Sequence, residues 1–467
     1  MQKKIVAAAA AILCASALPA LAQSTGASKV ELWGIVDAAV RHTNNEGANR
    51  SGLTKMVGGG MSQSRWGIKV EEDLGGGTKA FAEVENRFNA DDGTVSTPFF
   101  QLSYVGLQGK YGRVSMGRQW NVLFDVVTST YASFPYSPYM DAYKPELGMA
   151  AGARTSNALK YTLATPDRRW VGSLQYSFGE GNNADRFVQP GLAAANANMA
   201  VNAANIQAAG NAAAAAAMAA GATQAEAFAI GQAAGQRAGA QYAAQGIGGY
   251  LQGAGNDIRT VGQGAMKTMG GFLRYSADGI SVGAGYLQTK LPGGSKLDAW
   301  TLGGSYRSGP LYLNLGYGHN KFKAVTAGAG ADQSAQLSAA IRSNVDRAIL
   351  GSMWSGQTNG GFQPGNADKR NMWKIGFGYQ VTPQLNAGLH YFHAKQKGDP
   401  TGTSNGKANF IVAAADYAFS KRTDAYLAVD HTKVSGGAGM AIENPALTGG
   451  VAVRKRTGFT IGLRHRF

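Results

Sequence analysis

The feature that most constrains this chain is a period-two alternation of apolar residues with polar or small ones, repeated in segments of about ten residues. Over 373–379, Trp, Ile, Phe and Tyr occupy every second position, with Lys and Gly between them. The segments 311–318 and 411–419 repeat the pattern, and aromatic residues often end the apolar face. A soluble β-sandwich also alternates, but aromatic ends on strands of this length are typical of membrane-crossing strands.

These segments predict the fold class, an all-β, 16-stranded antiparallel transmembrane β-barrel. Beyond the N-terminal segment we find no convincing run of 18 or more strongly apolar residues. A chain without such a run must cross a membrane as a closed barrel, because lipid tolerates no unpaired strand edge. The predicted strands are 29–43, 61–72, 78–89, 99–109, 113–119, 156–164, 170–178, 266–276, 280–287, 297–307, 311–320, 370–380, 385–395, 408–419, 424–434 and 454–467.

The connections between these segments alternate between short and long, which supports the barrel topology. Short turns on the periplasmic side and long extracellular loops are typical of outer-membrane barrels. The predicted short turns are 73–77, 110–112, 277–279, 308–310 and 420–423, and the predicted long connections are 44–60, 120–155, 179–265, 321–369 and 435–453.

The N-terminus is predicted to be a cleaved signal peptide over residues 1–22. Two lysines precede an apolar run over 5–18, and Ala-Leu-Ala at 20–22 forms a cleavage pattern. The run is too short to cross a bilayer of about 30 Å as a helix. Cys14 is the only cysteine, so the mature barrel domain over 23–467 is expected to form no disulfide.

The charge and composition exclude several classes of protein. Removing the two signal-peptide lysines takes the formal net charge from +16 to +14. A basic nucleic-acid-binding protein rarely carries a secretion signal, so we expect no nucleic-acid partner and assign the charge to the inside of a pore. Aromatic residues make up 9% of the chain and alternating strands fill it, which argues against disorder.

One segment, 191–250, breaks the strand pattern, because about half of its residues are alanine and almost none is charged. Alanine favours a helix locally, but the Asn, Gln and Gly content argues against a transmembrane helix. Two interpretations stay open. The segment is either a low-complexity expansion of an extracellular loop, or a helical cap or adhesive surface at the mouth.

Six short motifs occur in order in the first third of the chain and at its end. They are VELWGIVD at 30–37, SRWGIK at 64–69, EDLGGG at 72–77, VGL at 105–107, YGRVSMGRQ at 111–119 and GLRHRF at 462–467. In this order they resemble the trimeric general porins of β-proteobacterial outer membranes. The resemblance implies a homotrimer in the outer membrane, in contact with its lipid, that passes small hydrophilic solutes without a cofactor. The insert at 191–250 departs from the family.

The C-terminal residue, Phe467, ends an apolar face of the last predicted strand. The resemblance implies that the barrel-assembly machinery reads this face, with Phe467 as the assembly signal. The plainer interpretation is a closing strand, and both can hold.

Charged residues that alternate with lipid-facing positions are predicted to line the lumen. Trp66 and Ile68 are predicted to face lipid, so Arg65 and Lys69 point inward. A charge on the lipid face near mid-membrane would cost about 2–4 kcal/mol. The lumen is then either simply polar or a basic wall that favours anions, and we favour the basic wall. The predicted pore-lining residues of the wall are Arg41, Arg65, Lys69, Glu85, Arg87, Arg118 and Lys160.

By its order in the chain, the connection 120–155 corresponds to the loop that narrows the pore in the resembled family. It carries Asp125, Asp141 and Glu146, which would face the basic wall and set a transverse field across the constriction. Two alternatives remain: a solute-specific outer-membrane channel, for instance for an organic anion, or an adhesin that uses the alanine-rich loop.

No enzyme motif is convincing. The sequence GISVG at 279–283 matches G-x-S-x-G, but it begins a strand where a nucleophile elbow needs a strand that turns into a helix. His390 and His393 are an odd number of positions apart on one predicted strand, so they point to opposite faces. We therefore expect no catalytic residue, no metal and no cofactor.

Overall fold

The computed structural model describes most of the chain. The predicted signal peptide, Asp141 and Glu146 lie outside the described residues. Those residues are 28–46, 50–131, 152–179, 205–253, 266–332, 335–336, 338–340, 342–347, 367–437, 442 and 453–467.

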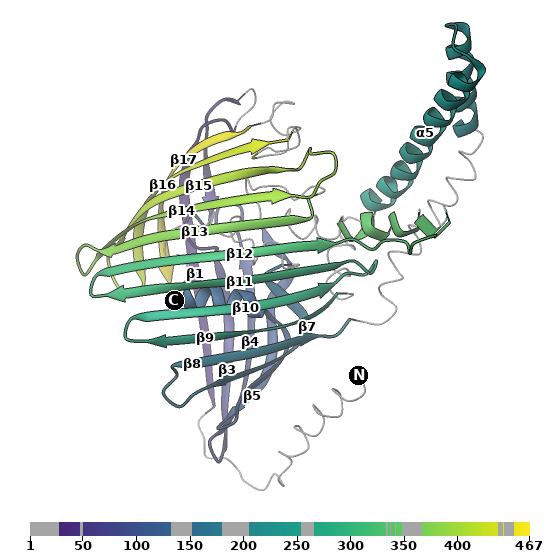
Figure 1. The fold of residues 1–467 in the computed structure, drawn as a ribbon. Helices are drawn as coiled ribbons and strands as arrows, with labels where there is room; N and C mark the ends of the chain where they lie inside the picture. Colours follow the sequence, from purple (N-terminus) through teal and green to yellow (C-terminus); the bar gives the residue numbers. More distant parts are fainter. Residues whose placement is uncertain are drawn as a thin grey trace.

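Within the described residues, seventeen strands form one antiparallel sheet that closes on itself (Figure 1). Each strand pairs with its neighbours in the chain, and β1 pairs with β17 to close the ring. The strands are β1 Lys29–Thr43, β2 Leu53–Gly58, β3 Arg65–Gly75, β4 Thr78–Phe88, β5 Val95–Gly109, β6 Gly112–Trp120, β7 Arg154–Ala164, β8 Trp170–Ser177, β9 Lys267–Ala277, β10 Ile280–Lys290, β11 Lys296–Ser308, β12 Leu311–Lys323, β13 Lys369–Gln380, β14 Leu385–Lys397, β15 Gly406–Ala418, β16 Thr423–Gly436 and β17 Lys455–Arg466.

Two of these strands, β2 and β3, together form one membrane-crossing position in the wall. β3 pairs with residues 29–35 of β1, and β2 pairs with residues 38–43 of the same strand. The predicted 16-stranded antiparallel barrel is therefore confirmed. The prediction that 44–60 is entirely a loop was wrong, because it contains β2.

The shortest connections, of two residues, lie at one end of the barrel, and the longest connections lie at the other (Figure 1). The turn between β9 and β10 is Asp278-Gly279, and both residues have a positive φ, of 51° and 79°. An Asp-Gly pair in this conformation is typical of a two-residue hairpin turn whose twist matches that of the strands. The connection pattern predicted from the sequence is thus present in space.

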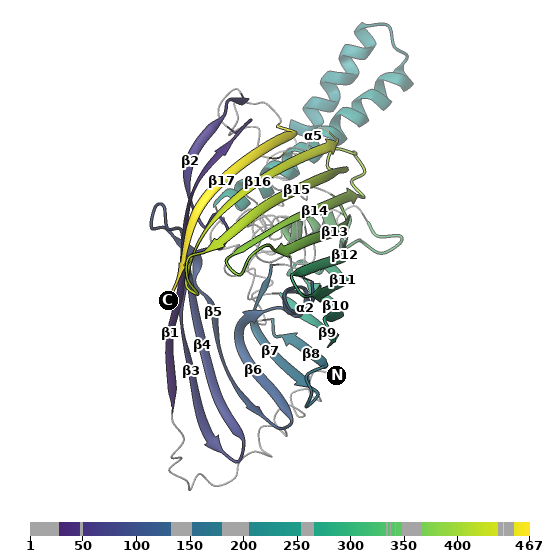
Figure 2. The same cartoon turned by 90° about the vertical axis from the view of Figure 1, so that its left-hand side faces the viewer.

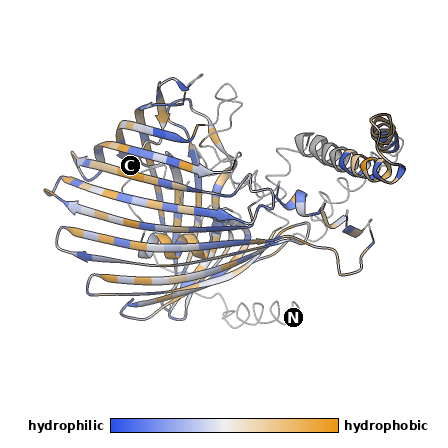
Figure 3. Cartoon of the chain, turned by 45° about the horizontal axis from the view of Figure 1, so that its top comes forward, coloured by the Kyte–Doolittle hydropathy of each residue, from blue (hydrophilic) through white to orange (hydrophobic). Residues whose placement is uncertain are grey.

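The barrel wall has an apolar outer face and an inner face rich in polar and small residues. In β10, the outward Val282 and Tyr286 are 45% and 43% exposed, while the inward Ser281 and Leu287 are 8% and 1% exposed. Figure 3 shows the same alternation along the strands. The exposed outer side chains are those that a lipid bilayer would cover.

From residue 205 on, the described part of the alanine-rich segment forms helices that extend from the loop end of the barrel (Figure 1). Residues 205–219 are helical, and α5 spans Gln224–Gly253. Before α5, the Thr223 backbone N–H donates to the Glu226 carboxylate at 2.9 Å, and the Glu226 N–H reaches the Thr223 hydroxyl at 3.4 Å, which forms a capping box. Among the described helices, none is long and apolar enough to cross a membrane.

Candidate functional site: the lumen around helix α2

The first feature of the lumen is α2, Val122–Thr130, which folds inside the barrel directly after β6 (Figure 2). Asn121 caps it, because its side-chain oxygen accepts the backbone N–H of Phe124 at 2.8 Å. Val122, Leu123 and Val126 are fully buried, and the helix packs mainly on β9, β10 and β11. This part of the 120–155 connection therefore folds inward, as the resemblance implied.

Inward-facing glycines make the seat for this helix. An added Cβ at Gly283 of β10 would lie 2.8 Å from a methyl group of Val126, and at Gly303 of β11 it would lie 2.6 Å from the ring of Tyr131. Carbon atoms do not pack this closely, so any larger residue would push the helix toward the pore axis. These glycines set how far α2 projects into the lumen.

Three arginines converge on one buried carboxylate on the wall beside α2. The Glu85 carboxylate lies 2.7 Å from Nε of Arg87, 3.7 Å from Arg154 and 3.9 Å from Arg65. The arginines come from β3, β4 and β7, and Arg65 is the most exposed of them, with 26% of its side chain accessible. We call Glu85 and these three arginines the Glu85 cluster.

Trp120 connects the Glu85 cluster to α2. The guanidinium of Arg154 lies 3.9 Å above the centre of its ring and that of Arg87 lies 5.1 Å away. On its other side, Trp120 stacks on Phe124 of α2, with ring centroids 3.6 Å apart and planes 7° apart. Cation–π contacts thus hold the arginines at the point where the loop enters the lumen. The sequence reasoning missed both Trp120 and Arg154.

Two predicted basic residues of the lumen lie opposite acids. Lys160 donates to Asp125 of α2 at 2.7 Å, so the described acid of the loop is matched by a lysine of the wall. Lys69 lies 3.9 Å from Glu83, and its side chain is 47% exposed. The register places Arg65 and Lys69 in the same row as Glu85 and Arg87.

Arg41 faces inward as predicted, but its charge is matched locally. Its two terminal nitrogens lie 2.6 and 3.0 Å from the two carboxylate oxygens of Asp430, and it also donates to Thr460 at 2.8 Å. Both charged side chains are almost fully buried. The pair therefore ties β1 to β16 and β17 and adds little to the field in the passage.

Arg118 does not fit the predicted pore lining. It pairs with Ser103 in the register, in the same row as the outward Met116, while Gln119 and Ser115 point inward. Its guanidinium donates to Ser156 at 2.8 Å. The pairing with β7 is irregular between Gly117 and Gln119, but the pairing with the outward Ser103 of β5 places Arg118 in the outer row of β6.

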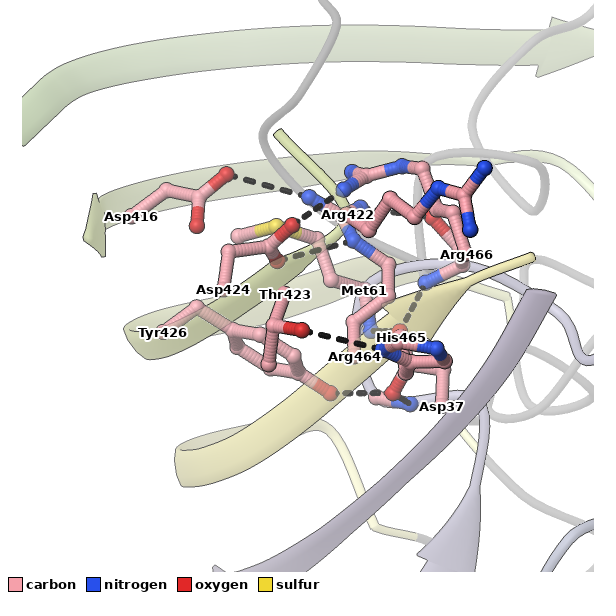
Figure 4. A network of polar contacts seen from close by, with 12 residues as sticks. Asp37, Met61, Asp416, Arg422, Thr423, Asp424, Tyr426, Arg464, His465 and Arg466 are labelled. Atoms are coloured by element: carbon pink, nitrogen blue, oxygen red, sulfur yellow. Dashed lines mark hydrogen bonds and ion pairs between the residues drawn. The ribbon is translucent and has the colours of Figure 1, made fainter. Parts of the chain in front are cut away.

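A second charged network lies where the barrel closes, and the sequence reasoning did not single it out (Figure 4). Arg464 of β17 donates to Asp424 at 2.9 Å, to Asp416 at 3.0 Å and to Ser62 at 2.7 Å. Nearby, Asp37 of β1 accepts the backbone N–H of Ser62 at 2.6 Å. We call this set the seam network. It holds the break between β2 and β3 against the last strand.

Other N–H and O–H groups complete the hydrogen bonds of Asp37. They come from Gly60 at 3.0 Å, Met61 at 3.1 Å and the hydroxyl of Tyr426 at 2.5 Å. The sequence does carry a signal for this network, because Asp37 on the first strand and Arg464 on the last both occupy inward positions and pair with each other in the register.

Phe467 lies at the same seam, at the short-turn end. Its backbone N–H donates to the carbonyl of Gly34, and its carbonyl accepts the N–H of Gly34, both at 3.0 Å. An added Cβ at Gly34 would lie 2.2 Å from a ring carbon of Phe467, so only glycine leaves room for this ring. The residue therefore completes the closing pair, while its role as an assembly signal stays a prediction.

The two histidines separate as predicted. His390 is buried in the lumen beside Asn314, 3.1 Å away, and His393 contacts Asn409 on the outer face. Within the described residues, no group of three or more His, Cys, Asp or Glu side chains could hold a metal ion.

A closed barrel with a charged inner wall, narrowed by a helix that folds inward, defines a pore-forming outer-membrane protein. The chain belongs to the Gram-negative porin family, whose model matches residues 7–335 and 231–437. It is 36% identical over 169 residues to outer membrane porin protein 32 of Delftia acidovorans, covering 34% of this chain and 45% of that protein.

Further similarities agree with this assignment. Major outer membrane protein P.IB of Neisseria meningitidis serogroup B is 33% identical over 128 residues, covering 27% of this chain and 36% of that protein. The matched parts therefore span less than half of either relative. The anion-selective porin from Comamonas acidovorans has the same fold, with a TM-score of 0.58 and 20% identity over 94% of this chain and 100% of that one.

Proposed function

We propose that the barrel passes small hydrophilic solutes by diffusion and that it favours anions. The observation that carries the proposal is the Glu85 cluster, in which three guanidinium groups of the wall surround one carboxylate beside the inward helix. Counting these four groups alone, three positive charges and one negative charge leave +2. Lys69 places an exposed ammonium on the same inner face, 3.9 Å from Glu83, so this pair leaves the sum unchanged.

The fixed positive charge of the Glu85 cluster can give the pore a preference for anions. A low-dielectric wall focuses fixed charge into the water column and raises the local concentration of counter-ions. The Debye length is about 10 Å at 0.1 M salt, so screening does not abolish the effect at physiological ionic strength. Asp125 opposes it only weakly, because Lys160 lies 2.7 Å from its carboxylate. The similar Comamonas porin is described as anion-selective, which also supports the proposal.

The test is the zero-current potential of the purified protein in a planar bilayer under a potassium chloride gradient. We expect the sign that corresponds to chloride preference at about 0.1 M salt, and a smaller bias at about 1 M, where the Debye length is about 3 Å. A potassium-selective channel at low salt would overturn the anion preference. Flux that saturates with solute concentration would support a solute-specific channel instead of a general pore.

We further propose that the protein is a homotrimer and that Phe467 assists its assembly. The similar OmpT of Vibrio cholerae is described in a trimer form. The outer face of β1 and β6 exposes apolar side chains such as Val40 and Met116, which a neighbouring subunit could cover. Native mass measurement in detergent tests the trimer. Deleting Phe467 should lower the yield in the outer membrane while leaving the conductance of inserted channels unchanged.

A further inference from the structure

The break between β2 and β3 leaves a short segment, residues 59–64, that does not belong to the barrel wall. β3 pairs with residues 29–35 of β1 and β2 pairs with residues 38–43, so 59–64 leaves the sheet between them. Met61, near its centre, is 6% exposed and packs on inward-facing side chains of three strands (Figure 4). These side chains are Ala39, Ala414, Tyr426 and Ala428. The segment therefore folds toward the lumen, and we call it the inner lip.

Asp37 of β1 holds the backbone of the inner lip. Its carboxylate accepts the N–H groups of three consecutive residues, Gly60, Met61 and Ser62. Its own backbone N–H donates to the hydroxyl of Ser64 at 3.0 Å, and this hydroxyl donates back to its carbonyl at 3.1 Å. Consecutive backbone N–H groups form a concavity that binds an anion, so the buried carboxylate fixes the shape of the lip. The lip therefore has a defined shape without strand pairing.

Gln63 of the inner lip reaches into the Glu85 cluster. Its side-chain oxygen accepts Nη1 of Arg87 at 2.8 Å, while Nε of the same guanidinium donates to Glu85 at 2.7 Å. An arginine can only donate, so the amide oxygen faces it and the amide nitrogen points away. That nitrogen donates to the hydroxyl of Ser96 at 3.3 Å, which fits this orientation. Arg87 is thus held from two sides, by a carboxylate of the wall and by a neutral amide of the lip.

The amide of Gln63 holds Arg87 without adding a charge. The four groups of the Glu85 cluster sum to +2, with Glu85 as the acid among them. A glutamate at position 63 would offer an oxygen to the same nitrogen of Arg87, and it would take the sum to +1. Arginine forms its strongest pairs with carboxylates, so the strength of the contact alone would favour glutamate here. Glutamine instead keeps the positive charge of the passage.

The inner lip and α2 lie on opposite sides of the lumen. α2 packs mainly on β9, β10 and β11, whereas the lip packs on β1, β15 and β16. With β2 and β3 counted as one position, β10 is the ninth of sixteen positions around the ring from β1, directly across the barrel.

The Glu85 cluster spans the wall between the inner lip and α2. Arg87 contacts Gln63 of the lip and also lies 5.1 Å from the centre of the Trp120 ring. Trp120 in turn stacks on Phe124 of α2. This chain of contacts runs around the inner face, so the lip, the cluster and the helix border the passage at the same level.

We propose that the inner lip is a second wall of the constriction and that Gln63 is a specificity-determining residue of the pore. Its amide positions the Arg87 guanidinium at the passage and adds no negative charge beside it. The inference rests on the anion preference proposed above, since it names a residue that contributes to this preference. A residue that only filled space at this place would act on folding and not on ion preference.

The first test compares the zero-current potential of Gln63→Glu with those of wild type and Arg87→Ser at about 0.1 M potassium chloride. Both variants lower the sum of the cluster from +2 to +1, so both should move the potential toward potassium by a similar amount. The control Gln108→Glu adds the same charge to the inner row of β5, six positions from Leu102, the partner of Glu85. At about 3.4 Å per residue this is about 20 Å, or about two Debye lengths, so its shift should be clearly smaller.

The second variant, Gln63→Met, keeps the length of the side chain and removes the acceptor. Arg87 then keeps its bond to Glu85 and loses its hold on the lip, so the guanidinium should pair more closely with the acid. Closer pairing weakens the field in the passage, so the potential should move toward potassium, by less than in Q63E. A potential of Q63M equal to that of wild type, or a shift of Q63E no larger than that of Q108E, would overturn the proposal.

These comparisons use differences from wild type, so they can be read whichever ion wild type prefers. A wild-type channel that prefers potassium would contradict the proposed anion preference alone. Heat-shifted gel mobility like that of wild type would show that each variant is folded.

The position of the lip at the passage is tested separately with a thiol. Because Cys14 is expected to leave with the signal peptide, Gln63→Cys gives the mature chain one thiol. A water-soluble methanethiosulfonate with a trimethylammonium group should react with it and lower the single-channel conductance. The control Met61→Cys, at a position that is 6% exposed, should not react in the folded channel. No reaction of Q63C, or unchanged conductance after a reaction confirmed by mass, would show that the lip lies away from the passage.

Discussion

Two arginine–carboxylate assemblies of the lumen, the seam network and the Glu85 cluster, differ in their balance of charge. In the seam network, Arg464 contacts two carboxylates of the neighbouring strands, and Arg466 shares one of them. In the Glu85 cluster, the described residues of the wall offer one carboxylate to three arginines. The comparison teaches that an inward arginine can either close the barrel or charge the passage, depending on the acids that its neighbours bring.

The largest expected effect is on stability at the seam. Arg464→Met leaves Asp416 without its guanidinium and the buried Asp424 with Arg466 alone, and breaking a buried pair costs about 3–5 kcal/mol. We expect the variant to unfold at a lower urea concentration than wild type, as measured by the loss of heat-modifiable gel mobility. The ion selectivity of the folded channels should not change. An unfolding midpoint equal to that of wild type would show that the network does not stabilise closure.

A smaller effect is expected at the seat of α2. Gly283→Val places side-chain atoms where Val126 and Thr130 already lie, and such overpacking costs about 1–3 kcal/mol. The helix should move toward the pore axis and lower the single-channel conductance. Gly328→Val serves as the control, because an added Cβ there meets nothing within 4 Å. Equal conductance in the two variants would contradict a seat that sets the pore width.

Removing the negative charge of Glu85 should change the ion selectivity in the opposite direction to removing an arginine of the Glu85 cluster. Glu85→Gln keeps the shape and removes one negative charge among Arg65, Arg87 and Arg154. The zero-current potential should move further toward chloride preference. A shift toward potassium would mean that Glu85 acts mainly by holding the arginines in place.

The smallest expected effect is at Arg118. Because it lies on the outer face with its guanidinium on Ser156, Arg118→Ser should leave the zero-current potential within error of wild type. A shift comparable to that of an inward arginine would show that the face assignment from the register is wrong.

The strands were predictable from the sequence because a two-residue period is a local property. For the same reason, the register puts Arg65, Lys69, Glu85 and Arg87 in one row, the row in which alternation had put them. The short β2 was missed because its residues LTKMVG lie in a polar region and alternate over only six positions.

The site was harder to predict, because its parts meet only when the barrel closes. Trp120 and Arg154 lie at the two strand ends that flank a long connection, and nothing in their local sequence shows that they stack. Arg118 was predicted to line the pore, although alternation with Ser115 already pointed it outward. The inward glycines, such as Gly283, were a usable signal for the place where a helix packs.

In our proposal the Glu85 cluster sets the ion preference, and the buried Arg41–Asp430 pair does not. The direct test is the zero-current potential at low salt for wild type, R65S/R87S and the neutral double variant R41S/D430S. We predict chloride preference in wild type and in R41S/D430S, and a clear shift toward potassium in R65S/R87S. A potential in R65S/R87S equal to that of wild type, or an equal shift in both variants, would contradict the account.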